Sequence, residues 1–283
     1  MAGAALSACA TSPNPAAVHR QAAFDAARIS EDIRVLSDDS FEGRGIATPA
    51  EAKVIAYLSQ HYAAAGLQPG GPNGQWTQDV ILNRFVQSNI HASLKLGDWT
   101  LPLTQGREVA ISTRRPADHV SLKDAPLVFV GYGIKAPERN WDDFKGQDLR
   151  GKILVVLVND ADFEDPSLNT FGGEAMTYYG RWTYKFEEAA RQGAAGVLIV
   201  RADPSAERVA MEGWIQRDLA VDLFRRAGLD FEQEKIKARS RDFQPVELTG
   251  ATLDARMDVK SERIVTHNVV AKLEGSTHPD ETI

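Results

Sequence analysis

The sequence predicts an α/β protein with about two domains. Its 283 residues suffice for two units that each bury a core, at roughly 150 residues per domain. The first third of the chain carries two helical patterns, whereas the rest alternates short apolar runs, bounded by Gly and Pro, with further helical patterns. Such an alternation of strands and helices is typical of an α/β fold.

Two helices are predicted in the first third. Ile29, Ile33 and Leu36 recur at i, i+4 and i+7 and place three aliphatic side chains on one stripe. The second helix begins with a capping box, in which Thr48 is the N-cap and Glu51 lies three residues later. Its other features are Pro49 at the first position, a buried face of Ile55, Leu58, Tyr62 and Ala65, and a stop at Gly66.

Strands are predicted from residue 76 onward. Apolar and polar residues alternate through 76–109, with a turn at Gly97-Asp98, which is typical of paired strands. Two continuous apolar runs, at 127–130 and 153–158, predict buried strands.

The second half continues with helices and strands in turn. A helix through 186–190 ends at Gly193 and leads into a strand at 197–200. The next helix carries Ile215, Leu219, Leu223 and Ala227 at spacings of four and ends at Gly228. A last strand with one buried face is expected at 268–273.

The composition excludes several classes of protein. Apolar residues make up 43% and charged residues 25%, which are values of a globular chain and not of a disordered or fibrous one. The net charge is −7, and the cations form no block, so we expect no nucleic acid as partner. The longest apolar runs, such as 194–200, are much shorter than the ~20 residues of a membrane span. No transmembrane segment is therefore expected.

The single cysteine, Cys9, lies in a distinctive context. The sequence Leu6-Ser7-Ala8-Cys9 resembles the lipobox of bacterial lipoproteins, in which small residues precede a cysteine that is acylated after signal cleavage. Residues 10–15 are small, polar or Pro, as in a flexible tether. Residues 1–24 are therefore expected to be a signal remnant and tether with a lipid anchor at Cys9. The alternative is an Ala-rich N-terminus without an anchor.

A search for chemistry-bearing residues finds no catalytic set. The six histidines form no His-Glu-x-x-His, His-x-Asp or His-x-His motif, and there is no Gly-x-Ser-x-Gly elbow. The local cluster of His278, Asp280 and Glu281 surrounds Pro279, which indicates a solvated turn and not a metal site. We therefore expect neither catalytic residues nor metal ligands in this chain.

One segment is unusually rich in aromatic residues. Four aromatic and two cationic side chains fall within 178–185. One hypothesis is the rim of a peptide-binding cleft, with rings for apolar side chains and Arg181 for a carboxylate. The other, which we favour, is a wedge that packs one domain against the next. The candidate rim residues are Tyr178, Tyr179, Arg181, Trp182 and Tyr184.

Several motifs together resemble one family. The segments 37–45 and 65–69 resemble the opening of the co-catalytic zinc aminopeptidases, whose peptidase fold is similar to that of glutamate carboxypeptidase and the transferrin receptor. The segments 130–134, 141–144, 148–153, 187–200 and 213–215 resemble the protease-associated domain inserted in these enzymes. Finally, 267–275 resembles the strand with which the chain re-enters the peptidase domain. The likeness runs from about residue 28 to the end.

The resemblance implies a domain organisation. It implies a truncated α/β peptidase lobe, made of the N-terminal helices in 25–109 and the start of the peptidase core in 251–283. A mainly β protease-associated domain with flanking helices would occupy 110–250. Relatives carry a longer loop where this chain has 200–211, so a deletion is expected there.

The resemblance also implies a function. The complete enzyme would be a secreted hydrolase that uses two zinc ions to remove N-terminal residues from peptide substrates. In this family the zinc ligands and the general-base Glu follow the position of Ile283, so the fragment alone is expected to bind no zinc and to be inactive. With the lipobox, the location would be the periplasm or outer membrane of a bacterium. The rival hypothesis is a non-catalytic lipoprotein that binds a peptide or a partner.

Overall fold

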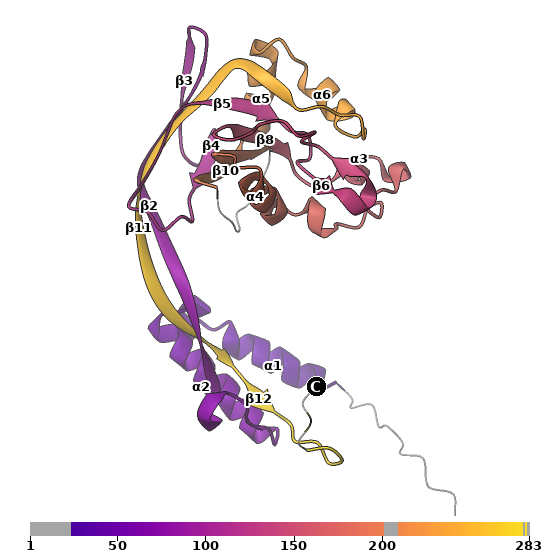
Figure 1. Cartoon of the computed structure of the whole chain (residues 1–283). Coiled ribbons are helices and arrows are strands. Elements are labelled where there is room, and N and C mark those ends of the chain that lie inside the picture. The colour runs from indigo at the N-terminus through magenta and orange to yellow at the C-terminus, as the bar shows by residue number, and fades with distance from the viewer. Residues whose placement is uncertain (1–23, 201–208, 280, 282–283) are drawn as a thin grey trace, which may run out of the picture. The chain divides into compact units, whose positions relative to one another are not determined.

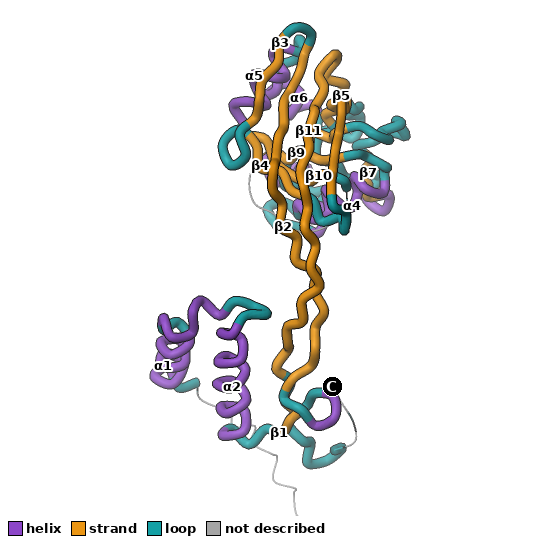
Figure 2. Tube along the Cα trace, turned by 90° about the vertical axis from the view of Figure 1, so that its left-hand side faces the viewer, coloured by secondary structure: helices purple, strands orange, loops and turns teal. Residues whose placement is uncertain are grey.

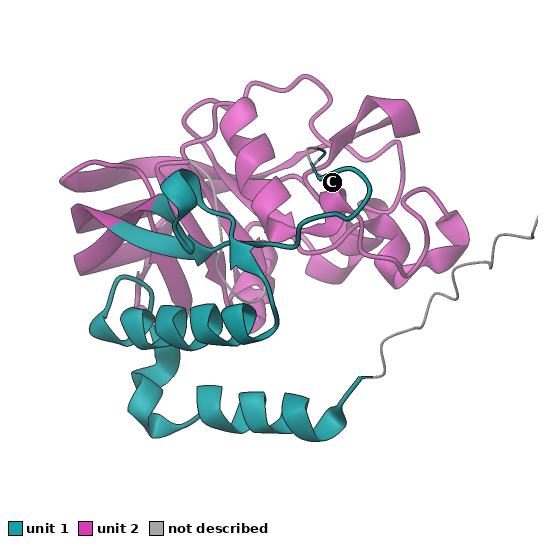
Figure 3. Cartoon of the chain, turned by 90° about the horizontal axis from the view of Figure 1, so that it is seen from below, with its two compact units in different colours: residues 1–80, 265–283 teal, residues 81–264 magenta. Residues whose placement is uncertain are grey.

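The structure, a computed structural model, describes residues 24–200, 209–279 and 281. The chain divides into two compact units (Figure 3). Unit 1 combines Met1–Val80 with Val265–Ile283, and unit 2 is the continuous segment Ile81–Ile264. A mixed eight-stranded sheet with helices confirms the predicted α/β class.

The sheet has the order β3-β2-β11-β5-β8-β9-β10-β4 (Figure 1). Its strands are β2 (Thr77–Leu96), β3 (Trp99–Leu103), β4 (Val109–Ser112), β5 (His119–Phe129), β8 (Ile153–Leu157), β9 (Gly196–Val200), β10 (Met211–Ile215) and β11 (Val246–Val269). β2 and β11, drawn in orange in Figure 2, are the longest strands, with 20 and 24 residues. Each has residues in both units. The strands predicted at 127–130, 153–158 and 197–200 are confirmed as parts of β5, β8 and β9.

The centre of the sheet is parallel. β5, β8, β9 and β10 pair in parallel, whereas β4 and β11 join them antiparallel. Side chains alternate between the two faces: Val155 of β8 belongs to one buried apolar cluster and Val156 to another. Leu223, in the helix that follows β10, belongs to the first cluster, and Phe186, in the helix before β9, belongs to the second. Helices therefore cover both faces of the sheet. This arrangement is typical of α/β proteins.

The helices of unit 2 follow these strands. They are α3 (Ala161–Glu164), α4 (Trp182–Arg191), α5 (Arg217–Arg226) and α6 (Phe231–Lys237). The predicted stops at Gly193 and Gly228 are confirmed, since both residues have positive φ just after a helix. The assignment of Ile215 to the helix was wrong, because Ile215 ends β10 and pairs with Val109 of β4. A buried strand residue can continue a helical spacing by chance.

Unit 1 is mainly helical in its first segment. It contains α1 (Ala26–Leu36), a 3₁₀ helix at Asp39–Arg44 and α2 (Pro49–Ala64), which confirm the two predicted helices. Gly66 at φ 82° confirms the left-handed stop of α2. The aliphatic stripe of α1 is not buried among the described residues: Ile29 is 47% and Ile33 62% exposed.

The second segment of unit 1 pairs with the first. Short strands β1 (Gln68–Pro69) and β12 (Ala271–Lys272) are antiparallel, and the Gly70 N–H donates to Val270 O at 2.9 Å. The predicted strand at 268–273 was wrong in its bounds, because β11 already runs to Val269 and Leu273 is exposed. The remaining short strands lie in unit 2, namely β6 (Lys135–Ala136) and β7 (Trp141–Asp142).

The compact units do not coincide with the domains expected at 110–250 and 251–283. Residues 81–109 and 251–264 belong to unit 2, because their strands join its sheet. β4 pairs with β10, and the segment 252–258 of β11 pairs with β5. The alternating segment after residue 76 therefore contributes to the sheet that the later strands form.

The capping box predicted at α2 was wrong in its side-chain bonds. The Thr48 hydroxyl donates to Gly45 O at 2.6 Å and accepts nothing from the helix. The Glu51 carboxylate accepts from the Ala47 N–H at 3.0 Å, the His267 N–H at 2.9 Å and the Thr266 hydroxyl. Glu51 therefore links the start of α2 to the end of β11 within unit 1.

These bonds predict that Glu51 contributes more to the stability of unit 1 than Thr48 does. Thr48→Ala should lower the free energy of unfolding by less than about 0.5 kcal/mol, since it removes one exposed bond. Glu51→Ala should lower it by about 2 kcal/mol, because two backbone donors lose their acceptor in a part-buried place. Glu51→Gln keeps one acceptor oxygen and should fall between them. Urea unfolding of the three variants checks the order, and a larger loss for Thr48→Ala than for Glu51→Ala would contradict it.

Candidate functional site

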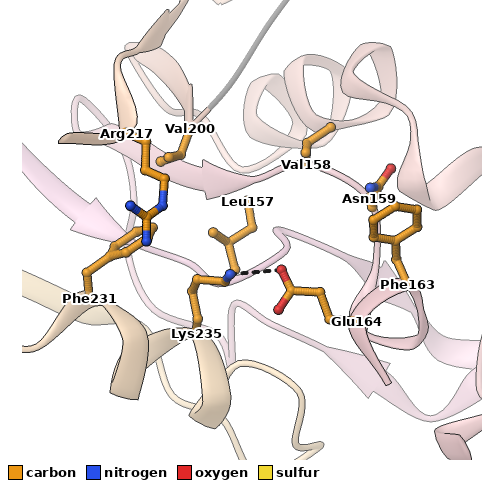
Figure 4. Close-up of a pocket in the computed structure, with 9 residues that line it drawn as sticks. All are labelled: Leu157, Val158, Asn159, Phe163, Glu164, Val200, Arg217, Phe231 and Lys235. Carbon is orange, nitrogen blue, oxygen red and sulfur yellow. Dashed lines mark ion pairs between the residues drawn. The ribbon is translucent and has the colours of Figure 1, made fainter. Parts of the chain in front are cut away.

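A pocket of about 420 Å³ lies in unit 2, and we call it the strand-end pocket (Figure 4). Its size falls within the range of small-molecule sites, roughly 300–1,000 Å³. The residues that line it are Leu157, Val158, Asn159, Phe163, Glu164, Val200, Arg217, Phe231 and Lys235.

The topology explains where this pocket lies. Leu157 and Val200 are the last residues of the parallel strands β8 and β9, and Arg217 comes two residues after the end of β10. In open parallel sheets, ligands bind in the crevice outside the carboxyl ends of the strands. Asn159, just after β8, has φ 67°, an uncommon left-handed conformation. The pocket therefore occupies the place where the fold itself forms a crevice.

Ion pairs set the charge of the pocket. Lys235 Nζ lies 2.9 Å from Glu164 Oε1, and Arg239 Nη2 lies 2.5 Å from Glu164 Oε2. Burial raises the pKa of Glu164, but the hydrogen bonds and charges of Lys235 and Arg239 outweigh it and hold the pKa below its ordinary value. Arg217 pairs with Glu232 outside the pocket lining. Glu164 is therefore a satisfied carboxylate.

A buried polar cluster adjoins the pocket through Asn159. Lys185 of α4 is 1% exposed and donates to Asn159 O at 2.8 Å and to Tyr179 O at 2.7 Å. The buried Asp143 accepts from the Ile134 N–H at 2.9 Å and from Trp141 Nε1 at 2.8 Å. Burial raises the pKa of Asp143 and lowers the pKa of Lys185, and their charges favour each other's ionised form.

Two further buried carboxylates belong to the same region. Desolvation raises the pKa of Asp160, which the charge of Lys185 opposes. Asp162 accepts from the Phe171 N–H at 2.6 Å and the Gly173 N–H at 3.1 Å. Lys185, Asp143 and Asp162 hold the loops around Asn159 in place, since each bonds to the backbone of another segment. Their role is positional, because all are nearly inaccessible to solvent.

The aromatic segment of 178–185 forms part of the core of unit 2. Tyr184 is buried, its ring lies 5.3 Å from Tyr178 and 5.0 Å from Tyr179, and its hydroxyl accepts from the Lys135 N–H at 3.0 Å. Trp182 is half-buried against the second apolar cluster, and Arg181 is exposed. Tyr178, Tyr179 and Tyr184 therefore lie together, and none of the five candidate rim residues lines the strand-end pocket.

The other candidates lie elsewhere. Cys9 falls outside the described residues. His278 Nδ1 lies 3.9 Å from Glu281 Oε1, and both side chains are largely exposed. In unit 1, His267 faces Glu51 with Nδ1 at 3.6 Å and Asp79 with Nε2 at 3.5 Å. Because the two carboxylates face opposite ring nitrogens, these three side chains do not converge on one ion.

The described residues offer no site that fits zinc. Within 24–200, 209–279 and 281, no group of three or more His, Cys, Asp or Glu side chains could hold a metal ion. The same described ranges contain no helix long and apolar enough to cross a membrane.

Sequence reasoning missed the strand-end pocket. The run at 153–158 was predicted as a buried strand, and the polar pair Asn159-Asp160 directly after it was the available signal. Arg217 and Lys235 come from α5 and α6, and no local motif connects them to Asn159.

Comparisons with family models and with curated proteins find no match for this chain. Solved structures do align with it. An aminopeptidase from Aneurinibacillus sp. strain AM-1 aligns at 20% identity and TM-score 0.45, covering 89% of this chain and 49% of that one. A zinc aminopeptidase from Bacillus subtilis aligns at 14% identity and TM-score 0.37, covering 90% of this chain and 49% of that one. A peptidase M28 precursor from Shewanella amazonensis SB2B aligns at 14% identity and TM-score 0.36, covering 88% of this chain and 54% of that one.

The chain thus spans about half the length of the solved structures that it matches.

Proposed function

We propose that this chain supplies the N-terminal helices and the inserted accessory domain of a secreted zinc aminopeptidase, whose metal ligands follow Ile283. One observation carries the proposal: unit 2 is a single continuous segment, and unit 1 is assembled from the two segments that flank it. The motifs at 37–45, 65–69 and 267–275, which resemble the peptidase lobe, all fall in unit 1. The segments that resemble the protease-associated domain all fall in unit 2.

The contacts inside unit 1 support this division. Glu51 of α2 binds Thr266 and His267, which lie 215 and 216 residues further along the chain. β1 and β12 pair the same two segments. A host domain that tolerates a long insertion needs such bonds, because they close the loop that the insertion leaves.

Unit 1 also presents apolar surface that suits a larger lobe. The stripe of Ile29 and Ile33 on α1 is exposed. A groove of about 270 Å³ lies between the α2 residues Val54, Ile55 and Leu58 and the end of β11. We propose that the rest of the peptidase lobe covers these faces, because isolated domains seldom leave them open.

In the complete enzyme the two zinc ions would activate a water and polarise the scissile carbonyl of a peptide substrate. The part that we propose for this chain lies outside that chemistry. Unit 1 contributes α1 and α2 to the lobe, and unit 2 restricts which peptides reach the cleft.

Production of the protein with the sequence that follows Ile283 in its gene tests the proposal. The longer protein should hold about two zinc ions and hydrolyse aminoacyl-anilides, and the 283-residue chain should do neither. A gene without a His-x-Asp motif after Ile283, or a longer protein without zinc and hydrolysis, would contradict it. Either result would favour the non-catalytic binding lipoprotein.

We further propose that Cys9 carries a lipid anchor, which would place the protein in the periplasm or at the outer membrane. The support is the sequence Leu6-Ser7-Ala8-Cys9 and the tether that follows. Expressed with its upstream signal, the protein should incorporate labelled palmitate and enter a detergent phase. Cys9→Ser should abolish both, and an unlabelled wild type would contradict the anchor.

A further inference from the structure

We propose that the strand-end pocket binds the C-terminal residue of a peptide, with Arg217 binding the free carboxylate and the apolar wall holding the side chain. The proposal goes beyond the function proposed above. It concerns unit 2 alone and does not depend on the chain being part of a peptidase.

The first argument is the charge of the pocket. Its lining contains two cations, Arg217 and Lys235, and one carboxylate, Glu164. Glu164 is already bound by Lys235 and Arg239, so it offers little to a ligand cation. The lining thus holds one more cation than carboxylates, and the acids that pair with Arg217, Glu232 and Asp218, lie outside it, so Arg217 is the group that can receive an anionic ligand.

The second argument is the state of Arg217. It pairs with Glu232 and, at 3.9 Å, with Asp218, and all three side chains are more than half exposed, at 56%, 53% and 89%. Such exposed pairs contribute little stability. A ligand carboxylate can thus replace Glu232 at small cost. The planar guanidinium of arginine binds a carboxylate through two parallel N–H bonds, which lysine cannot do.

The third argument is the apolar wall. Leu157, Val200 and Phe231 form one side, and the Arg217 guanidinium lies 5.9 Å from the centre of the Phe231 ring (Figure 4). Phe163, on the short helix α3, lines the pocket and is 53% exposed. An apolar side chain bound here would cover the Phe163 ring, which would release ordered water from both surfaces.

The same charges distinguish a peptide from a free amino acid. A free amino acid would bring an ammonium group next to Arg217 and Lys235, where Glu164 is already bound by Lys235 and Arg239 and Glu232 also lies 3.8 Å from Lys235. In a peptide the corresponding nitrogen is a neutral amide. The peptide C-terminus is therefore the better ligand.

Titration of the isotope-labelled chain with four small probes, followed by NMR, tests the proposal. N-acetyl-leucine carries the carboxylate and the apolar side chain, and no aminopeptidase activity would consume it. It should shift the amides of Asn159, Phe163 and Phe231 and saturate. N-acetyl-leucinamide lacks the carboxylate charge and should bind about tenfold more weakly. N-acetylglycine and free leucine should also be weaker, because one lacks the side chain and the other adds an ammonium group.

Variants locate the carboxylate contact. Arg217→Gln should weaken the binding of N-acetyl-leucine about tenfold and leave the binding of N-acetyl-leucinamide unchanged. Arg217→Lys keeps the charge but not the two parallel bonds and should lie between. Arg225→Gln, an exposed arginine on the same helix, is the matched control and should change nothing.

The proposal would be overturned by equal binding of N-acetyl-leucine and N-acetyl-leucinamide, by unchanged binding of N-acetyl-leucine to Arg217→Gln, or by the absence of any saturable shift. Free leucine binding more tightly than N-acetyl-leucine would replace the peptide terminus by an amino acid and also overturn it.

Discussion

Lys185→Met should lower the free energy of unfolding by about 3–5 kcal/mol at pH 7, the range found when one partner of a buried charge pair is removed. The variant leaves the buried Asp143 and Asp160 without the charge of Lys185, which favours their ionised forms. It also removes the donor to the carbonyls of Asn159 and Tyr179. Lys260→Met, on an exposed lysine of β11, should stay within about 0.5 kcal/mol.

The pH dependence gives this prediction a specific sign. In the wild type, burial raises the pKa of Asp143 and lowers the pKa of Lys185, so their effects on the pH dependence of stability have opposite signs and partly cancel. In the variant, the raised pKa of Asp143 rises further because the charge of Lys185 no longer opposes it. A carboxyl group whose pKa is higher in the native state than in the unfolded state stabilises the native state at low pH. This contribution is lost as the pH rises through the native pKa. The deficit of Lys185→Met should therefore shrink from pH 8 to pH 5.

Urea unfolding at several pH values measures both effects. A loss no larger than that of Lys260→Met, or a deficit that grows as the pH falls, would show that Lys185 does not balance these carboxylates.

The second large effect is expected for Gly213→Ala, at about 3 kcal/mol of lost stability. A Cβ at Gly213 would lie 2.5 Å from Ala110 O and 2.8 Å from Ile111 Cγ2, both on the neighbouring strand β4. The first of these is a backbone atom, so β4 itself must move away from β10. Gly275→Ala is the control, because its nearest neighbour would be at 3.4 Å, an ordinary contact.

Hydrogen exchange shows where the strain goes. The amides that pair β4 with β10, around Ile111 and Gly213, should lose protection, while those between β8 and β9 keep it. If β4 keeps full protection and the stability of Gly213→Ala matches that of Gly275→Ala, the close packing of β4 on β10 is contradicted.

Elements with local signals could be predicted from the sequence. The stop at Gly66 follows from one glycine in a left-handed conformation, and the run at 153–158 from continuous apolar character. The bonds of Glu51 could not be predicted, since the carboxylate that a capping box would turn to Thr48 binds Thr266 instead. A contact across 215 residues outweighs the local preference, and no local pattern records it.

The same distinction holds for the candidate site. The polar residues after β8 were visible in the sequence, and the rule that crevices form at strand ends would have pointed to Asn159. Arg217 and Lys235 reach the pocket only because β10 lies beside β9, which brings the helices that follow it to the same edge. The sequence therefore predicts the strands but not which helical side chains meet at their ends.

We propose that unit 2 closes its own core, whereas unit 1 is part of a larger lobe. In unit 2, β8 is buried between two neighbouring strands with helices on both faces. In unit 1, the described residues after Val269 form one two-residue strand, β12, and Leu273 is exposed. Protection from exchange follows local burial and hydrogen bonding.

Native-state hydrogen exchange on the 283-residue chain tests this claim most directly. The amides of Ile153–Leu157 should exchange only through global unfolding of unit 2, and those of residues 269–273 should exchange through local opening, faster by about three orders of magnitude or more. Equal and strong protection of both segments would contradict the claim. It would mean that unit 1 completes its own fold, and the binding lipoprotein would then be the better account.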